Sequence, residues 1–572
     1  MNRIRRRRRA ARRGRLFRRL AGLVLIATAV YAVIFFVLPS RLHTDPDWKG
    51  EKKPIFVQGE PTGYSAAGTG ENLLLPLPLL QKIVDPSIRY ESGTQSVILT
   101  TASDLLYMQA EQTEASLNNK PLQLRLAPEQ KGDTTYLPAE PLKMLYGLDL
   151  HEDAGTGAVL LMLAGESVPL GQVKGPEGGK SAALRSGPSI RDKVLADMPP
   201  GTRLRIWREE GNWLFAQMDN GYSGYIQAEK VKDAGTKTVQ AKPPAPTHAE
   251  RSWTGKKINL TWEAVYDRQA VLSSLDGLTG VNVVSPTWFE IVDGHGNVRS
   301  KADSAYVEKA QSKGIEVWGL MSNGFEPDIT SQALASYENR MNAIVQMLKY
   351  AELYHLDGIN IDFENVYTED GGNVTQFMRE LKPLAEARNL IVSMDVSPKS
   401  GSEMWSRFLD RRALGPLVDF MMVMAYDEHW ASSPEAGSVA SLPWAQNAVE
   451  RILEEDGVPA DKLVLGIPLY TRIWSETTKD GKNKVSSKAV GMKTVEDILS
   501  EKKLTPKFAA DAGQNYVEYK EKGVLQRIWI EDKVSLEARV NMARSLNLAG
   551  VASWNRNFAN RAAWETLSGI HD

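Results

Sequence analysis

The sequence of 572 residues contains no cysteine. Disulfides, a thiolate nucleophile and a zinc–thiolate site are therefore excluded, and the folded domains depend on their hydrophobic cores. Histidine is also scarce: the seven histidines are scattered, and none forms a His-Glu-x-x-His pair of the kind that binds zinc in hydrolases. We accordingly predict no metal site and no cofactor.

Acidic residues are missing from the N-terminus. Residues 1–19 contain 11 of the 69 Lys and Arg residues and none of the 70 acids, although the whole chain has a formal charge of only −1. A charge-free apolar run, residues 20–38, follows directly. As a helix this run would span roughly 28 Å, close to the thickness of a bilayer core. The positive-inside rule then predicts a cytoplasmic segment at 1–19, a single transmembrane anchor at 20–38 and an extracellular remainder.

Two other interpretations of this N-terminus are less favoured. A cleaved signal peptide has an apolar region of about 7–15 residues and a small-residue cleavage site. The run here is longer and ends in Leu38-Pro39-Ser40-Arg41, which favours an uncleaved anchor. An arginine run can also bind nucleic acid. Because an apolar span follows it directly, we predict membrane contact and no nucleic-acid partner.

The next part of the chain repeats itself. A polar stretch rich in Gly, Pro, Ser and Thr, residues 39–70, is typical of a tether. Within residues 71–165, Leu75-Pro76 returns as Leu137-Pro138 and Val97-Ile98-Leu99 as Val159-Leu160-Leu161, a period of 62 residues. Each copy predicts a short helix after a proline, then a turn and a strand. This duplicated αβ unit resembles the N-terminal domain of copper amine oxidases, and we predict a structural stalk.

Residues 180–232 contain short alternating strands separated by turns, which predict a small all-β barrel. The run GNWLFAQMDNGYSGYI within them resembles bacterial SH3-like domains. That resemblance implies contact with the cell wall, although its aromatic residues Trp213, Tyr222 and Tyr225 fit a barrel core equally well. A Pro-rich linker, residues 233–254, follows.

Strand-like apolar runs alternate with helical stretches throughout residues 255–572. Eight such runs predict a parallel sheet closed as a (β/α)8 TIM barrel of the α/β class. The segments are Ile258–Trp262, Val281–Ser285, Ile315–Met321, Gly358–Phe363, Leu390–Val396, Phe420–Met424, Leu463–Ile467 and Ala549–Trp554. An open doubly wound sheet is the alternative, but no Gly-rich phosphate loop follows the first strand. Residues 474–527 are too long for a simple loop and predict an α+β insertion.

The segment DGINIDFE, Asp357 to Glu364, carries the clearest chemical signal. Strand side chains alternate, so Asn360, Asp362 and Glu364 share one face, and the apolar residues between them share the other. In a barrel the polar face would enter the lumen, where unpartnered carboxylates are costly. Glu364 comes last, at the carboxyl end of the strand, where barrel active sites lie.

This segment resembles the Asp-x-x-Asp-x-Asp-x-Glu motif on the fourth strand of glycoside hydrolase family 18, in its cell-wall and spore-cortex branch. Three further segments resemble the family's sixth, seventh and eighth strands: MMVMAYDEHW (421–430), GIPLYTRIW (466–474) and GVASW (550–554). The chain departs from the motif at one position, where Asn360 replaces the second aspartate. That change removes a carboxylate that could share a proton with Asp362.

The resemblance implies substrate-assisted catalysis. Glu364 would protonate the glycosidic oxygen, Asp362 would hold the acetamido N–H of the substrate, and Tyr426 would donate to its acetamido oxygen. The acetamido group itself would attack the anomeric carbon. The remaining implied site residues are the supporting Asp357, Asn360 and Asp427 and the substrate-binding Trp554, Tyr470, Met424 and Trp288.

Together these observations predict a membrane-anchored extracellular glycosidase that hydrolyses an N-acetylglucosamine-containing glycan, with peptidoglycan or spore cortex preferred to chitin. Its predicted partners are that glycan, the cell wall through the SH3-like domain, and the membrane through residues 20–38. A catalytically weak, lectin-like wall protein of the same fold is the main alternative, but the chain retains both Asp362 and Glu364. A metal-dependent hydrolase using Asp357, Asp362 and Glu364 is disfavoured because no further ligand cluster is visible.

Overall fold

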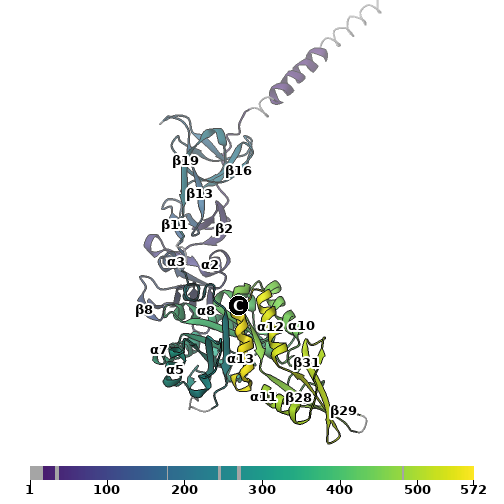
Figure 1. Ribbon diagram of the computed structural model, residues 1–572. Coiled ribbons are helices and arrows are strands. Elements are labelled where there is room, and N and C mark those ends of the chain that lie inside the picture. The colour runs from purple at the N-terminus through teal and green to yellow at the C-terminus, as the bar shows by residue number, and fades with distance from the viewer. Residues whose placement is uncertain (1–16, 33–37, 177, 242–245, 267–271, 480–481) are drawn as a thin grey trace, which may run out of the picture. The chain divides into compact units, whose positions relative to one another are not determined.

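Figure 1 shows the computed structural model, which describes residues 17–32, 38–176, 178–241, 246–266, 272–479 and 482–572. These residues form two compact units. The first extends to residue 243, except for residues 98–107 and 116–121, which belong with the barrel in the second. Most of the predicted Arg-rich segment and part of the predicted linker lie outside the described residues.

Residues 17–32 are helical, and residues 33–37 of the predicted anchor lie outside the described residues. The side chains of Leu20, Leu23, Leu25 and Ile26 on this helix are each more than half exposed. No helix in the described part of the chain combines the length and the apolar character needed to cross a membrane.

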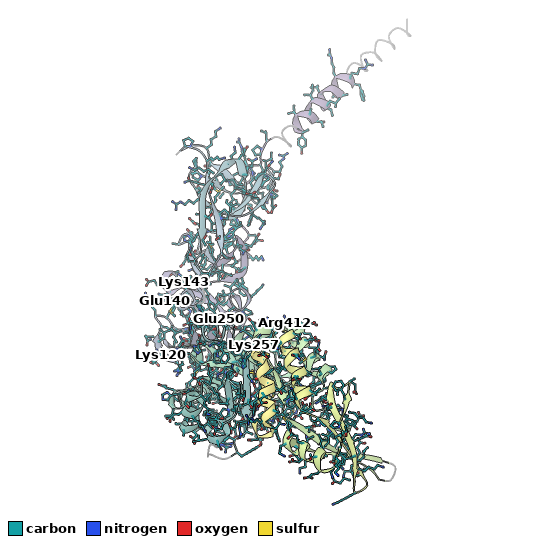
Figure 2. The ribbon with its side chains drawn as sticks, in the orientation of Figure 1. Lys120, Glu140, Lys143, Glu250, Lys257 and Arg412 are labelled. Carbon is teal, nitrogen blue, oxygen red and sulfur yellow. The ribbon has the colours of Figure 1, made fainter. Side chains whose placement is uncertain are left out.

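The two copies of the predicted repeat pair with each other. Strand β3 (Leu74–Pro76) runs antiparallel to β10 (Thr134–Pro138), with Leu75 opposite Leu137. Each strand ends in a proline that precedes a helix, α2 (Leu77–Ile83) and α3 (Ala139–Tyr146). A residue with a fixed φ angle suits the start of a helix. In α3, Glu140 lies in the first turn and Lys143 in the last, the arrangement that the helix dipole favours (Figure 2).

Short sheets complete this region. They are β11-β12-β1-β2, β3-β10-β9 and β4-β5-β6-β7-β8. Their other strands are β1 (Pro54–Val57), β2 (Glu60–Ser65), β4 (Arg89–Glu91), β5 (Ser96–Thr100), β6 (Leu105–Gln109), β7 (Glu114–Leu117), β8 (Lys120–Gln123), β9 (Glu129–Lys131), β11 (Asp149–Glu152) and β12 (Val159–Met162).

A seven-stranded antiparallel sheet, in the order β15-β14-β18-β17-β16-β13-β19, occupies the region of the predicted small barrel. Its strands are β13 (Ser167–Val173), β14 (Ala182–Arg185), β15 (Val194–Met198), β16 (Arg203–Glu210), β17 (Trp213–Gln217), β18 (Ser223–Gln227) and β19 (Val231–Thr238). Leu184, Leu204 and Ile226 form its buried core, whereas Trp213 is only partly buried. The all-β prediction for this region is confirmed.

Eight parallel strands close into a barrel, because the first strand pairs with both the second and the last. The strands are β20 (Ile258–Glu263), β21 (Val283–Ile291), β23 (Glu316–Ser322), β24 (Gly358–Asp362), β25 (Ile391–Val396), β26 (Phe420–Val423), β27 (Leu463–Pro468) and β33 (Gly550–Trp554). The barrel prediction is confirmed and the open-sheet alternative is wrong. Strand β21 continues beyond the predicted segment because its end pairs with the short β22 (Val298–Ser300).

Helices follow the strands and surround them (Figure 1). They are α5 (Ser304–Ser312), α6 (Pro327–Ala335), α7 (Tyr337–Leu353), α8 (Gly371–Glu386), α9 (Arg411–Leu414), α10 (Leu442–Arg451), α12 (Lys533–Ser545) and α13 (Arg561–Leu567), with α4 (His248–Trp253) ahead of the first strand. Capping residues define several helix starts: the Asp303 side chain accepts two backbone N–H groups of α5.

The barrel has two apolar layers. Ile359, Ile361 and Phe363 belong to the outer core between strands and helices, and Phe363 packs against Phe377 of α8. Each such buried side chain contributes about 1.5–3 kcal/mol to stability. The inner layer fills the lumen and includes Trp262 and Trp318. The alternation predicted for DGINIDFE is therefore confirmed for its apolar side chains.

An antiparallel sheet with one helix is inserted after β27, as predicted. Its strands run in the order β29-β28-β32-β31-β30. They are β28 (Tyr470–Lys479), β29 (Lys482–Gly491), β30 (Lys507–Ala509), β31 (Gln514–Glu521) and β32 (Val524–Ile530), and the helix is α11 (Met492–Glu501). The insertion begins a few residues earlier than predicted, because β28 starts at Tyr470.

Candidate active site

Strand β24 carries its polar side chains into the barrel at its carboxyl end. Asn360 is fully buried and Asp362 is only 7% exposed. The backbone of β24 is held between β23 and β25, with Asn360 opposite Leu320 on one side and Ser393 on the other. Because both neighbours are full strand partners, the directions of these side chains are determined by the barrel itself.

Glu364 follows the end of β24 and is fixed through its backbone. Its N–H donates to Oδ1 of Asn323 (3.0 Å), and its carbonyl oxygen accepts from Nδ2 of the same residue (2.7 Å). The Asn323 amide, itself fully buried, also donates to Thr330 Oγ1 (2.8 Å). Sequence reasoning missed Asn323, which lies just beyond β23 and carries no recognisable motif.

The environment of the two acids favours their protonated forms. Burial raises the pKa of Asp362 to about 7. Burial also raises the pKa of Glu364 well above its usual value, and the nearby negative charges of Asp362 and Asp427 raise it further. A carboxyl group with such a pKa retains its proton near neutral pH, as a general acid requires.

A third buried acid, Asp395 on β25, was missed by sequence reasoning. It is 2% exposed, and burial together with the charges of Asp362 and Glu364 raises its pKa well above the usual value. A signal was present: Ser393 and Asp395 alternate with apolar residues in the otherwise hydrophobic segment 390–396. The same period-two argument that selected Asp362 would have placed Asp395 in the lumen.

Asn360 is held by donors from the first two strands. Its Oδ1 accepts hydrogen bonds from Trp262 Nε1 and from Ser285 Oγ, both at 3.3 Å. Two donors on the oxygen identify the orientation of the amide, because its Nδ2 must then point elsewhere. Asn360, an uncharged residue, therefore connects β24 to Trp262 and Ser285 of the first two strands inside the lumen.

Tyr426 and Asp427 follow β26 at the same end of the barrel. Burial raises the pKa of Tyr426, and the charges of Asp395 and Glu364 raise it further, so its hydroxyl stays a neutral donor. Asp427 Oδ1 accepts hydrogen bonds from Tyr470 Oη (2.7 Å) and from an Arg472 guanidinium nitrogen (3.0 Å). The start of the insertion thus fixes Asp427 beside the site.

Trp554, at the end of β33, is partly buried and lies 6.1 Å from Trp262 between ring centroids. It packs against the inner apolar layer together with Tyr426. Met424, just after β26, is 9% exposed. Both residues lie at the end of the barrel that holds the three acids.

Two of the predicted site residues lie elsewhere. Asp357 is at the amino end of β24, where its Oδ2 accepts from the Val317 backbone N–H (2.8 Å) and from Gln311 Nε2 (3.0 Å). Trp288 is buried in the outer core, with its ring 5.4 Å from that of Tyr306. The structure does not bring either residue to the acids, because strand position and side-chain alternation direct them away.

Among the described residues, no group of three or more His, Cys, Asp or Glu side chains is arranged to hold a metal ion. What the described side chains offer is a proton donor at Glu364, two further buried carboxyl groups, a neutral hydroxyl at Tyr426 and an aromatic face at Trp554.

Comparisons with known proteins agree with this geometry. Residues 304–559 match the family model for glycosyl hydrolases family 18, residues 56–161 that for the copper amine oxidase N-terminal domain, and residues 178–233 that for the bacterial SH3 domain. The three resemblances seen in the sequence are confirmed.

Similar proteins include an uncharacterized glycosylase, YvbX, of Bacillus subtilis, 25% identical over 301 residues that cover 50% of this chain and 84% of that protein. The cortical fragment-lytic enzyme of Bacillus anthracis is 25% identical over 287 residues, covering 48% of this chain and 64% of that enzyme. A crystal structure of the Bacillus cereus spore cortex-lytic enzyme SleL has the same fold, with a TM-score of 0.51 and 19% identity over 60% of this chain and 78% of that one.

Proposed function

Because residues 304–559 form a family 18 glycosyl hydrolase domain, we propose that this protein hydrolyses N-acetylglucosamine-containing glycan of the cell wall, by a mechanism in which the substrate supplies the nucleophile. One observation carries the proposal most directly. Glu364, whose pKa is raised, follows Asp362 by two residues at the carboxyl end of β24, and Asn323 holds its backbone on both sides.

In the first step, Glu364 donates its proton to the glycosidic oxygen while the substrate's acetamido oxygen attacks the anomeric carbon. The glycosidic bond breaks, and a cyclic oxazolinium-like intermediate forms. Asp362 accepts the acetamido N–H, and the Tyr426 hydroxyl donates to the acetamido oxygen, so that both stabilise the charge that develops there. The carboxylate of Glu364 then removes a proton from water, which opens the intermediate with net retention.

The two-carboxylate separation that distinguishes retaining from inverting glycosidases does not apply to this mechanism, because no enzyme carboxylate attacks carbon. Trp554 offers an aromatic face on which a sugar ring would stack. Tyr470, fixed by its hydrogen bond to Asp427, would contact a sugar hydroxyl at the rim.

Peptidoglycan is the substrate that the rest of the chain favours. A bacterial SH3 domain at residues 178–233 accompanies the hydrolase domain. One of the proteins similar to this chain is a cortical fragment-lytic enzyme. A wall-binding module would raise the local concentration of the enzyme on its polymer. We therefore propose peptidoglycan or spore cortex ahead of chitin.

We also propose that residues 20–38 anchor the protein in the membrane with the hydrolase domain outside. The Arg-rich segment that precedes them and the exposed apolar side chains of residues 20–26 support this topology. Protease added to intact protoplasts should remove the hydrolase domain. Protection of that domain, or a mature chain that starts after residue 40, would contradict the anchor.

Digestion of purified peptidoglycan tests the activity itself. The products should carry new N-acetylglucosamine reducing ends, identified by mass spectrometry, and the Glu364→Gln variant should release none above background. N-acetylglucosamine oligomers of chitin serve as the competing substrate. Faster cleavage of chitin than of peptidoglycan would favour a chitinase, and wall binding without cleavage would favour a lectin.

A further inference from the structure

Two buried carboxyl groups stand next to each other across the β24–β25 pair. Ile361 lies opposite Met394 in this parallel register, and the next residues along the two strands are Asp362 and Asp395. Neighbouring strands lie about 4.8 Å apart, and residues one step beyond a matched pair point to the same face. The two carboxyl groups therefore enter the lumen side by side.

Neither group is neutralised in the usual way. Oδ1 of Asp362 and Oδ1 of Asp395 are both buried without a hydrogen-bond partner in the described part of the chain. Two neighbouring carboxylates that are buried away from water cannot both ionise at low cost. Burial raises the pKa of Asp362, and burial together with the charge of Asp362 raises the pKa of Asp395.

The position of Asp395 bears on the one departure of this chain from the family motif. Asn360 stands where the motif has its second aspartate, two residues before Asp362 on the same strand. Its amide cannot carry a titratable proton. Asp395, on the adjacent strand β25, places a carboxyl group next to Asp362.

We propose that Asp395 and Asp362 form a proton-sharing pair, in which Asp395 on β25 replaces the carboxyl group that Asn360 lacks on β24. The proposal rests on the proposed function, since it assigns Asp395 a role in the same site. Asp395 is a positioning residue: it acts through Asp362 and not on the substrate.

The surroundings of the pair explain how one proton would be held. Burial and the charges of Asp362 and Glu364 raise the pKa of Asp395, and the neighbouring polar side chains of Asn360 and Trp262 partly offset that rise. Tyr426 contributes a hydroxyl that stays neutral because burial, and then the charges of Asp395 and Glu364, raise its pKa. These described groups include no cation, so a proton is what limits the negative charge of the pair.

The shared proton has a mechanistic consequence. When Glu364 gives its proton to the leaving group, a negative charge appears beside the pair. With one proton retained between them, Asp362 is free to accept the acetamido N–H as an anion while the pair carries only a single negative charge. Such interacting groups titrate together, with two apparent pKa values that belong to the pair.

Kinetics of the full-length protein on an aryl N-acetylglucosaminide provide the first test. Asp395→Asn, which keeps the shape but cannot share a proton, should lower kcat on the order of 10-fold and leave KM within about twofold. It should also replace the two ionisations of the pair in the pH profile of kcat by one. Ser393→Ala, on the same strand and face one step deeper, is the matched control and should change neither.

Moving the carboxyl group back to β24 provides the second test. The double variant Asn360→Asp/Asp395→Asn should recover kcat to within about threefold of the wild type and restore the second ionisation. A purely structural role for Asp395 predicts no such recovery. An unchanged pH profile in Asp395→Asn, or a double variant as slow as the single one, would overturn the proposal.

Infrared spectroscopy gives a readout that does not need activity. In the Glu364→Gln background, one pH unit above the pKa of about 7 for Asp362, a protonated carboxyl band should persist and should vanish when Asp395→Asn is added. If the band is absent before that addition, the pair does not share a proton. If the band behaves as expected but the wild type cleaves no N-acetylglucosaminide, the proposed function fails and the pair remains.

Discussion

Two sets of acids, at opposite ends of the barrel, have opposite environments. At the amino end, Asp357 precedes β24 and Asp419 precedes β26, and each carboxylate accepts the backbone N–H of a neighbouring strand, from Val317 and Val392 (both 2.8 Å). Each also has a side-chain donor, Gln311 for Asp357 and Lys382 for Asp419 (2.6 Å). These acids are satisfied and join adjacent strands.

At the carboxyl end, Asp362, Asp395 and Glu364 are buried together, and the pKa of each is raised. The barrel bears the cost of desolvating them without pairing them with cations. The contrast shows that burial of an acid does not by itself identify a site. What distinguishes Asp362, Asp395 and Glu364 is burial without a cationic partner, which raises their pKa values as a proton donor near neutral pH requires.

The largest effect is expected when Glu364, at the carboxyl end, can no longer donate a proton. Glu364→Gln keeps the shape of the side chain and should lower kcat/KM on the order of 10²-fold or more for substrates with poor leaving groups. Much of the loss should be recovered with an activated aryl leaving group, which needs little protonation. Equal losses on both substrates would show that Glu364 is not the general acid.

The motif itself offers a matched pair of acids. Asp362→Asn should lower kcat on the order of 10²-fold, because the amide cannot stabilise the charge on the acetamido group. Asp357→Asn, five residues earlier at the amino end, should leave kcat within about twofold. Steady-state kinetics on one N-acetylglucosaminide compares them, and a large kcat loss in Asp357→Asn would contradict the division between the two ends.

At the amino end we expect loss of stability without loss of chemistry. Asp419→Asn removes the charge that Lys382 pairs with inside the protein, and should lower the free energy of unfolding by about 2 kcal/mol. Urea denaturation measures this change, and kcat per folded molecule should be unchanged. A stable but inactive variant would place Asp419 in the site.

The smallest expected effect is on the pH dependence of stability. Burial raises the pKa of Asp362 from 3.8 to about 7, so between these values the native state binds more protons than the unfolded one. Stability from this group is therefore present at low pH and declines as pH rises through that window. Asp395→Asn should relieve the pair and raise Tm above pH 7, on the order of 2 °C, with no gain at pH 4. A lower Tm of Asp395→Asn than of the wild type above pH 7 would show that repulsion between Asp362 and Asp395 does not destabilise the native state.

Much of the architecture could be predicted from local patterns. Continuous apolar runs predicted all eight barrel strands, and alternation in DGINIDFE placed Ile359, Ile361 and Phe363 against the helices. The Leu-Pro repeat predicted a helix after each proline, and both helices are present. Such features depend on spacing along the chain, which the sequence displays directly.

The site was only partly predictable for the same reason. Asp362 ends β24 and Glu364 follows it by two residues, so a single alternating segment reveals both. Asp395 and Asn323 come from neighbouring strands and were missed, whereas Trp288 was expected at the site and lies in the outer core. Their relation to Glu364 depends on register across β23, β24 and β25, which no local pattern contains.

The sequence by itself thus determined the barrel, its family resemblance and the positions of Asp362 and Glu364 at the carboxyl end of one strand, because each depends on the order and period of nearby residues. Tertiary structure alone decided which acids are compensated. Asp357 and Asp362 lie five residues apart in one segment, yet one meets a backbone N–H and the other meets a second buried carboxyl group. The physical reason is that the solvation of a charge depends on everything that surrounds it, and in a closed barrel most of those neighbours come from other strands.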